Sequence, residues 1–251
     1  MAVYLVTGAG SGIGLAVAEA ARAKGHRVCL FDLSFPEGRQ PDADAIYFEG
    51  DVTDLRSCQN AAEQAVRTFG QLDGLSHNAG IQRYGSVQDT DNETWDEIIS
   101  VNLTGGFNIA KATLPELRKS RGSLVFMGSV QSIATQQNVA AYTAAKHGLL
   151  GLARSIAMDF AGDGVRSNVV APGAVKTPML DWAVSLADDP DALWSVLHGM
   201  HPLGRIATAI EVANVVMFLL SDEASFVTGE IVRVDGGLLS QIAGTPRGVE
   251  R

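Results

Sequence analysis

The segment Thr7-Gly8-Ala9-Gly10-Ser11-Gly12-Ile13-Gly14 decides the fold of this chain. It follows a short apolar run at residues 3–6 and precedes a helical pattern at 13–23, so its glycines occupy a turn between a strand and a helix. Glycine suits such a turn because a Cβ atom would block both the tight bend and a ligand that approaches the backbone closely. The free N–H groups and the dipole of the helix converge there and favour an anion. We therefore expect the pyrophosphate of a dinucleotide to be bound by Gly8, Ser11, Gly12, Ile13 and Gly14. A turn with a purely structural role is the weaker alternative.

Asp32 ends the second apolar run, residues 28–31, and lies 18 positions beyond Gly14. A carboxylate in this place can accept hydrogen bonds from both hydroxyls of an adenosine ribose, and it repels a ribose 2′-phosphate. The residue therefore favours NAD over NADP as the cofactor. An Asp that only begins the polar turn at 34–40 is the alternative, and Arg39 in that turn could reach a 2′-phosphate.

Asp51 and Val52 follow the third apolar run, residues 45–48. They could present a carboxylate and an amide to the adenine of the cofactor. They could also simply lead into a helix that begins at Asp54, and the two interpretations are compatible.

Short apolar runs alternate with longer helical patterns along the chain, which is typical of βαβ units and of a parallel sheet buried on both faces. Strands are predicted at residues 3–6, 28–31, 45–48, 74–77, 123–127, 166–170 and 231–234. Helices are predicted at residues 13–23, 54–69, 94–119, 140–161 and 209–221. We therefore expect one α/β domain over residues 1–251, a doubly wound Rossmann fold with helices on both faces of a parallel seven-stranded sheet.

Two segments stand apart from this alternation. Residues 179–201 lack a strand pattern and contain Asp188-Asp189-Pro190-Asp191, which predicts an inserted, partly helical lid over the substrate. The tail after Gly237 contains Gly244, Pro246 and Gly248, which disfavour a terminal helix. We expect this tail to be frayed or held by a neighbouring subunit.

The composition excludes several classes of partner. A net charge of −9 predicts repulsion from nucleic acids and from anionic membranes. Cys29 and Cys58 have no paired cysteine or histidine cluster nearby, so neither a disulfide framework nor a metal site is expected. The opening residues lack the basic region of a secretory signal, and no apolar run approaches the ~20 residues of a membrane helix. We expect a cytoplasmic protein.

Tyr142 and Lys146 lie four positions apart in a helical pattern, so their side chains share one face of the helix. An adjacent ammonium lowers the pKa of a tyrosine from about 10 and makes the phenol a usable general base. Alone, such a pair is usually a surface contact. Ser129 changes this view because it lies just beyond the strand 123–127, at the sheet edge where open α/β folds bind ligands.

Taken together, these motifs make the sequence similar to the classical short-chain dehydrogenase/reductase family. The matching residues, in chain order, are Thr7-Gly8-x-x-x-Gly12-Ile13-Gly14, Asn78-Ala79-Gly80, Asn102, Ser129, Tyr142-x-x-x-Lys146 and Pro172-Gly173 with Thr177. The resemblance spans nearly the whole chain. It implies hydride transfer between a substrate carbon and a nicotinamide, with no metal.

The resemblance also implies roles for the individual residues. Tyr142 exchanges a proton with the substrate oxygen, Ser129 hydrogen-bonds that oxygen, and Asn102 supports a water that links Lys146 to solvent. Lys146 also holds the nicotinamide ribose. Further cofactor contacts are implied for Asn78, Ala79, Gly80, Pro172, Gly173, Val175 and Thr177. A homotetramer assembled through the helices at 94–119 and 140–161 is expected as well.

The substrate is expected to be polar. Hydrogen-bonding residues flank the proposed chemistry, and the candidates for substrate contact are Arg83, Gln131, Gln136, Gln137 and Met179. Three functions stay open: an NAD-dependent dehydrogenase of a sugar, polyol or sugar acid, acting on an alcohol or a lactol; an NADP-dependent carbonyl or 3-oxoacyl-carrier-protein reductase; and a nucleotide-sensing protein without turnover. The complete set of catalytic residues argues against the third.

Overall fold

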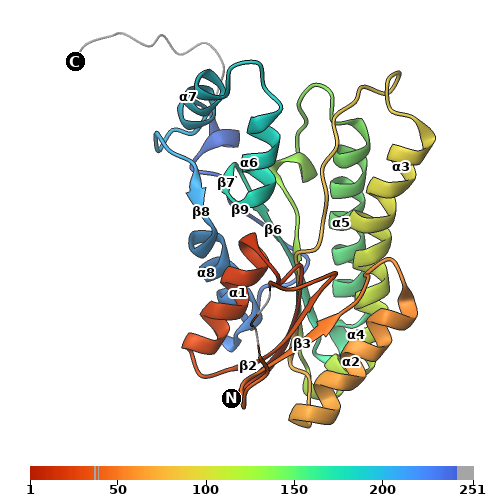
Figure 1. Cartoon of the computed structure of the whole chain (residues 1–251). Coiled ribbons are helices and arrows are strands. Elements are labelled where there is room, and N and C mark those ends of the chain that lie inside the picture. The colour runs from red at the N-terminus through yellow and green to blue at the C-terminus, as the bar shows by residue number, and fades with distance from the viewer. Residues whose placement is uncertain (37, 39, 242–251) are drawn as a thin grey trace.

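The protein is described by a computed structural model that covers residues 1–36, 38 and 40–241. A parallel sheet of seven strands runs through its centre in the order β3-β2-β1-β4-β5-β6-β9 (Figure 1). Its strands are β1 (Val3–Thr7), β2 (Arg27–Asp32), β3 (Ala45–Glu49), β4 (Gly74–His77), β5 (Ser123–Met127), β6 (Arg166–Pro172) and β9 (Ile231–Val234). The predicted doubly wound α/β fold is confirmed.

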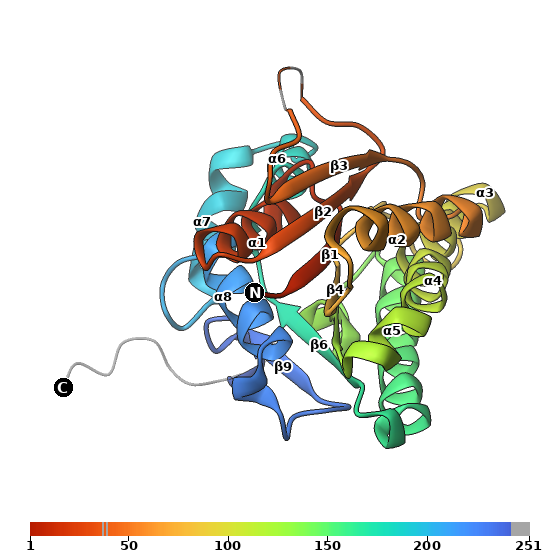
Figure 2. The same cartoon turned by 90° about the horizontal axis from the view of Figure 1, so that it is seen from below.

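Helices cover both faces of this sheet (Figure 2). One face carries α1 (Gly12–Ala23) and α8 (Ala209–Leu220), and the other carries α2 (Leu55–Phe69), α4 (Gly105–Ser120) and α5 (Ala140–Asp159). Alternate residues of β1 pack on opposite faces of the sheet, because successive side chains of a strand point in opposite directions. Val3 and Leu5 pack with α2, α4 and α5, whereas Tyr4 and Val6 pack with α1 and α8. Both faces of the central strands are buried, which explains why β1, β2 and β5 consist mostly of apolar residues.

The direction in which the sheet grows reverses between β1 and β4. The chain adds β2 and β3 on one side of β1, then returns to add β4, β5 and β6 on the other side. Thr7 at the end of β1 pairs with His77 at the end of β4. A reversal of this kind opens a crevice beyond the carboxyl ends of the strands, where open α/β sheets bind ligands.

The single helix predicted over 94–119 is wrong. The chain forms α3 (Asn92–Ile99), a π-helical turn (Ser100–Thr104) and then α4. Asn102 explains the break, because its Nδ2 donates hydrogen bonds to the carbonyl oxygens of Ile98 (3.0 Å) and Ile81 (2.9 Å) and so competes with the regular ladder. π-Turns of this kind occur frequently at functional sites.

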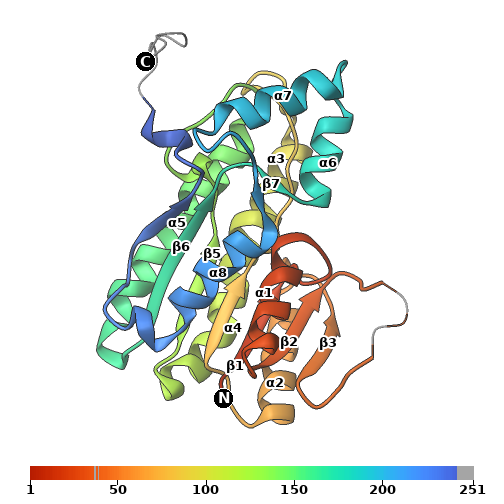
Figure 3. The same ribbon diagram turned by 90° about the vertical axis from the view of Figure 1, so that its left-hand side faces the viewer.

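Residues 179–201 contain two helices, α6 (Pro178–Ser185) and α7 (Pro190–Met200), which lie beyond the carboxyl ends of the strands (Figures 1 and 3). Two short strands not predicted from the sequence, β7 (Val175–Lys176) and β8 (Ala207–Thr208), pair beside them. α7 contains no buried residue. Among the helices of the described residues, none combines the length and apolar character that a membrane crossing requires.

One expectation about the surface changes with the structure. The sequence predicts that the helix at 140–161 contributes its apolar residues to a subunit interface. Leu149, Leu150 and Ile156 of α5 are buried in the core of the chain itself, so they do not support that interface. The exposed apolar side chains nearby are instead Phe107 in α4 and Met158 in α5. The tail lies outside the described residues beyond position 241.

Candidate active site

A cavity of about 850 Å³ opens at the carboxyl ends of the central strands. This volume falls within the roughly 300–1,000 Å³ of small-molecule sites. The cavity is lined by every site residue predicted from the sequence except Gln137, which is exposed on the loop before α5. The inclusion of Gln137 among the cavity residues is therefore wrong, because a loop of exposed residues gives no sequence signal for which side chain turns inward.

The glycine turn between β1 and α1 is packed too closely for side chains. A Cβ at Gly14 would lie 2.1 Å from the carbonyl oxygen of Gly8, and one at Gly8, whose φ is +63°, would lie 2.7 Å from the amide nitrogen of Ala79. Ser11 precedes α1 without a side-chain cap, so the first amides of this helix remain available to an anion. The turn therefore fits the pyrophosphate of a dinucleotide.

The carboxylate of Asp32 is fixed at the wall of the same cavity. Its Oδ2 accepts a hydrogen bond from the amide of Gly10 and its Oδ1 accepts one from the amide of Leu33, both at 2.7 Å. These bonds hold a negative charge beside the glycine turn, as expected for a residue that selects the ribose of the cofactor. Arg39, the cation that could counteract this selection, lies outside the described residues.

Asp51 and Val52 line the cavity beyond β3, and Asp54 caps α2 by accepting hydrogen bonds from the amides of Arg56 and Ser57. The two interpretations of this segment are thus compatible. On the opposite side, Thr177 caps α6, and a Cβ at Gly12 would lie 3.5 Å from its Cγ2. The loop after β6, with Pro172, Gly173 and Val175, therefore meets the glycine turn across the cavity.

His77 at the end of β4 is a residue that the sequence analysis missed. The Thr7 hydroxyl accepts hydrogen bonds from the amides of Asn78 (3.1 Å) and Ala79 (3.2 Å), and it lies 2.8 Å from Nδ1 of His77. Because both lone pairs of the Thr7 oxygen are occupied, its O–H donates to Nδ1, and the proton of the neutral ring resides on Nε2. Burial, with the charge of Lys146, lowers the pKa of His77 to about 3. The ring thus stays neutral and braces the Asn78-Ala79-Gly80 turn.

Ser129, Tyr142 and Lys146 converge on the cavity from β5 and α5. Lys146 is 4% exposed, and its Nζ lies 5.3 Å from the centre of the Tyr142 ring while it donates a 2.8 Å hydrogen bond to the carbonyl of Met127. The prediction that this ammonium lowers the tyrosine pKa is wrong for this structure. Burial raises the pKa of Tyr142 to about 12, although hydrogen bonding with Ser129 opposes the shift, and burial lowers the pKa of Lys146 to about 8.

Asn102 completes this cluster from the π-turn. Its Nδ2 is bonded to backbone carbonyls, but its Oδ1 is buried without a partner among the described residues. Gly80 lies between this oxygen and the lysine, because a Cβ there would lie 2.7 Å from Asn102 Oδ1 and 3.6 Å from Lys146 Nζ. Glycine at position 80 thus keeps a small polar space open between the two side chains.

The two walls of the remaining cavity differ in polarity. Gln131 is 9% exposed and its Oε1 is buried without a partner among the described residues, and Gln136 lines the same wall. The lining residues from α6 and α7 are mainly apolar and include Met179, Leu180, Ala183, Leu197 and Met200. The lining of the cavity is therefore polar in part and apolar in part.

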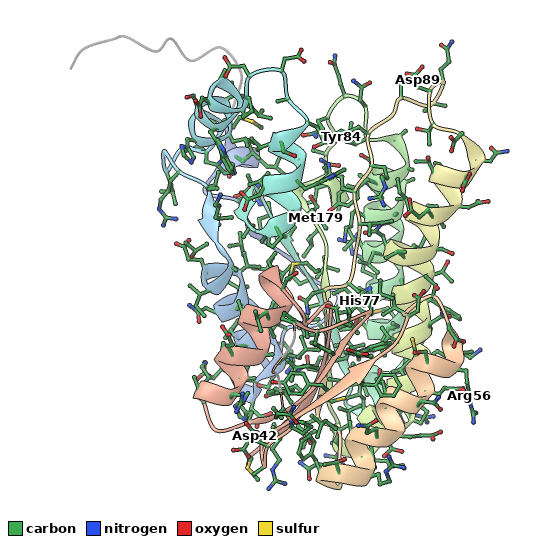
Figure 4. All side chains as sticks on the ribbon, in the orientation of Figure 1. Asp42, Arg56, His77, Tyr84, Asp89 and Met179 are labelled. Carbon is green, nitrogen blue, oxygen red and sulfur yellow. The ribbon has the colours of Figure 1, made fainter. Side chains whose placement is uncertain are left out.

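Arg83 reaches the cavity with its charge already paired. Its Nη2 lies 2.9 Å from Oε1 of Glu97, and its guanidinium lies 5.8 Å from the ring centre of Trp182 in α6. Tyr84, another residue the sequence analysis missed, stacks on Trp182 with ring centres 6.4 Å apart. Figure 4 shows Tyr84 and Met179 in the upper part of the molecule, above His77. The described residues contain no cluster of three or more side chains that could hold a metal ion.

A glycine turn at the carboxyl end of β1, next to a cluster of Ser129, Tyr142, Lys146 and Asn102 in the same cavity, is the site of a nicotinamide-dependent oxidoreductase. Comparison with known proteins identifies the family to which the chain belongs. The family described as enoyl-(acyl carrier protein) reductase matches residues 8–239. The chain belongs to the short-chain dehydrogenase/reductase family, whose members are NAD(P)-dependent enzymes acting on alcohol and ketone groups.

Individual relatives are similar over almost their full length. A 2-(S)-hydroxypropyl-CoM dehydrogenase of Xanthobacter autotrophicus is 39% identical, with 94% of this chain and 96% of the relative covered. A 3-oxoacyl-[acyl-carrier-protein] reductase of Escherichia coli is 38% identical at the same coverage of both chains. The ligand-free structure of an aldohexose dehydrogenase of Thermoplasma acidophilum is 35% identical with a TM-score of 0.92, covering 98% of this chain and 97% of that one.

Proposed function

We propose that the protein is an NAD-dependent dehydrogenase that interconverts a secondary alcohol and a ketone, or a lactol and a lactone, on a polar small molecule such as a sugar, polyol or sugar acid. We further propose that the chain is one catalytic domain in which α6 and α7 form the lid over the substrate, and that it works as a homotetramer. The observation that supports NAD as the cofactor is the fixed carboxylate of Asp32. It offers acceptors to the ribose hydroxyls and opposes a 2′-phosphate.

The side chains around the reacting oxygen suit proton transfer. Tyr142 lies in position to take the proton of the substrate hydroxyl, and Ser129 to donate a hydrogen bond to the same oxygen. When bound, the oxidised cofactor supplies a hydride acceptor and a positive charge, and that charge opposes the effect of burial on the pKa of Tyr142. Lys146 would hold the nicotinamide ribose, while Asn102 Oδ1 would accept from a water that continues the proton path to the lysine.

The main support for a polar substrate comes from Gln131. A buried acceptor without a donor costs about 1–3 kcal/mol, and a substrate hydroxyl that donates to Gln131 Oε1 would remove this cost. The aldohexose named for the Thermoplasma enzyme has hydroxyls of this kind next to its reacting carbon. The apolar wall from the lid then packs against the carbon skeleton of the substrate.

The reduction of a 3-oxoacyl group with NADP is the second candidate, and the E. coli relative supports it. Two features of this chain oppose it. Asp32 disfavours the 2′-phosphate of NADP, and the net charge of −9 disfavours an acidic carrier protein.

A substrate panel tests the proposal. Aldoses, polyols, sugar acids, hydroxysteroids and simple cyclohexanols are assayed for nicotinamide reduction with NAD and with NADP. We expect polyhydroxylated substrates and NAD to give the highest kcat/KM, and Gln131→Leu to lower kcat/KM on them about tenfold or more. Gln137→Leu, an exposed amide outside the cavity, is the matched control and should leave kcat/KM unchanged. Higher efficiency on steroids or cyclohexanols would contradict the polar substrate.

Arg83→Ala separates acids from neutral sugars. If Arg83 leaves Glu97 to bind a substrate carboxylate, the variant loses activity on sugar acids and keeps it on polyols. Equal activity of the variant on both groups would limit Arg83 to its contacts with Glu97 and Trp182.

A further inference from the structure

His201 is buried in a part of the chain where almost everything else is exposed. It directly follows α7, a helix without a single buried residue, yet its own side chain is only 3% exposed. Besides this anchor, α7 is held by the ammonium of Lys176 over the ring of Trp194 at 4.4 Å and by a hydrogen bond from Gln241 to the carbonyl of Met200. These contacts tie α7 to β7 and to the segment that follows β9.

Both ring nitrogens of His201 have a defined partner. The amide of Ala174 donates to Nε2 at 3.2 Å, so Nε2 is the acceptor and the proton of the neutral ring is on Nδ1. Nδ1 donates to the carbonyl of Leu197 at 2.7 Å, which satisfies one of the free carbonyls at the end of α7. The ring thus bridges the last turn of α7 and the loop after β6.

The loop at the other end of this bridge is part of the cofactor crevice. Gly173 and Ala174 line the cavity, and a Cβ at Gly173 would lie 2.6 Å from Nε2 of His201, so ring and loop are in close contact. Leu197 and Met200 of α7 line the apolar wall of the same cavity. One side chain therefore connects the wall that faces the substrate with the loop that faces the cofactor.

We propose that His201 is a positioning residue that ties α7 to the Gly173-Ala174 loop, so that cofactor binding orders the substrate wall formed by Leu197 and Met200. This inference rests on the proposed function, because it takes the loop after β6 as a cofactor contact. A cofactor that immobilises the loop fixes the amide of Ala174, and through His201 it also fixes the end of α7. The substrate then meets an ordered wall only after the cofactor has bound.

Amide hydrogen exchange of the full chain, free and with NADH as the probe, tests this proposal. His201→Asn keeps a donor near the Leu197 carbonyl but cannot reach Ala174, whereas His201→Gln places an acceptor near the Ala174 amide. We expect the Ala174 amide to exchange about tenfold faster in His201→Asn and close to the unmodified rate in His201→Gln. His198→Asn, an exposed histidine one turn earlier on α7, is the matched control and should leave this rate unchanged. His201→Phe, which fills the space without a hydrogen-bonding nitrogen, is the second variant and should behave like His201→Asn.

NADH provides the readout of coupling. It should slow exchange across residues 190–200 in the unmodified protein, in His198→Asn and in His201→Gln, but not in His201→Asn or His201→Phe. Equal slowing in all five proteins, or an unchanged Ala174 rate in His201→Asn, would overturn the proposal. Failure of NADH to bind the unmodified protein would overturn the proposed function and the coupling together, and the comparison of free proteins would still decide whether His201 holds the loop.

Discussion

Replacement of Asp32 by Asn should shift the cofactor preference by a predictable amount. The two side chains have nearly the same shape, and the carboxamide oxygen can still accept the hydrogen bond from the Gly10 amide. The variant loses the second acceptor, which binds the Leu33 amide, and it loses the negative charge that would repel a ribose 2′-phosphate, for which we take a separation of about 5 Å. At an effective dielectric constant of about 20–40, a half-buried carboxylate repels a phosphate of about −1.5 to −2 charges by roughly 3 kcal/mol after screening. This corresponds to about a hundredfold change in discrimination.

The assay compares kcat/KM for NAD and NADP at fixed ionic strength. We expect the unmodified protein to prefer NAD, and the NAD/NADP ratio to fall about a hundredfold in Asp32→Asn. Asp32→Ala should lose the preference too, with weaker binding of NAD because both acceptors for the ribose are gone. Asp44→Asn, a carboxylate outside the cavity, is the control for overall charge. An equal efficiency of the unmodified protein with both cofactors, or an unchanged ratio in Asp32→Asn, would refute the reasoning.

Three further predictions concern the catalytic cluster, the buried histidine and the assembly. Tyr142→Phe should abolish turnover but keep the dissociation constant for NADH, whereas Lys146→Ala should lose activity and also bind NADH more weakly; near-normal turnover of the Phe variant would remove Tyr142 from the chemistry. His77 has a pKa of about 3 in the fold and about 6.5 when unfolded, so the unfolded chain binds more protons between these values and stability falls as the pH drops below 6.5. Between pH 7.5 and 5, protonation of this residue in the unfolded chain should lower the free energy of unfolding by about 2 kcal/mol. Urea unfolding should therefore show that His77→Asn loses less stability over this pH range than the unmodified protein. The same loss of stability in both proteins would contradict the prediction. Light scattering at micromolar concentration should give a tetramer, and Phe107→Glu on the exposed face of α4 should weaken it, while a monomer would contradict the proposed assembly.

The parts of the fold that follow from local patterns could be predicted from the sequence. The strands Gly74–His77, Ser123–Met127 and Ile231–Val234 have the predicted bounds, and the last two of them are short, mainly apolar segments. β7 and β8 are two residues long, too short for any periodicity to indicate them. The π-turn at Ser100–Thr104 was missed because Asn102 breaks the helix through a hydrogen bond to Ile81, which is distant in the sequence.

The candidate site likewise contains residues that could be predicted from the sequence and residues that could not. The glycine turn and the Tyr142-Lys146 pair carry their chemistry in their spacing, so the sequence identified them. The raised pKa of Tyr142 depends on how much water the fold removes, and neighbouring charge alone did not predict its direction. His77 carried a weak signal, its place directly before Asn78 at a strand end, but its role depends on the hydroxyl of Thr7 from another strand.

The absence of buried residues in α7 has a consequence for how this enzyme could change. Substitutions on an exposed helix usually alter stability by less than about 0.5 kcal/mol, so the positions of α7 that face the cavity can vary without threatening the fold. Leu197 and Met200 line the cavity, while the central strands of the sheet lie in the core. Mutational libraries restricted to α7 should therefore yield many folded proteins with altered substrate range, which makes this helix the natural starting point for directed evolution of specificity.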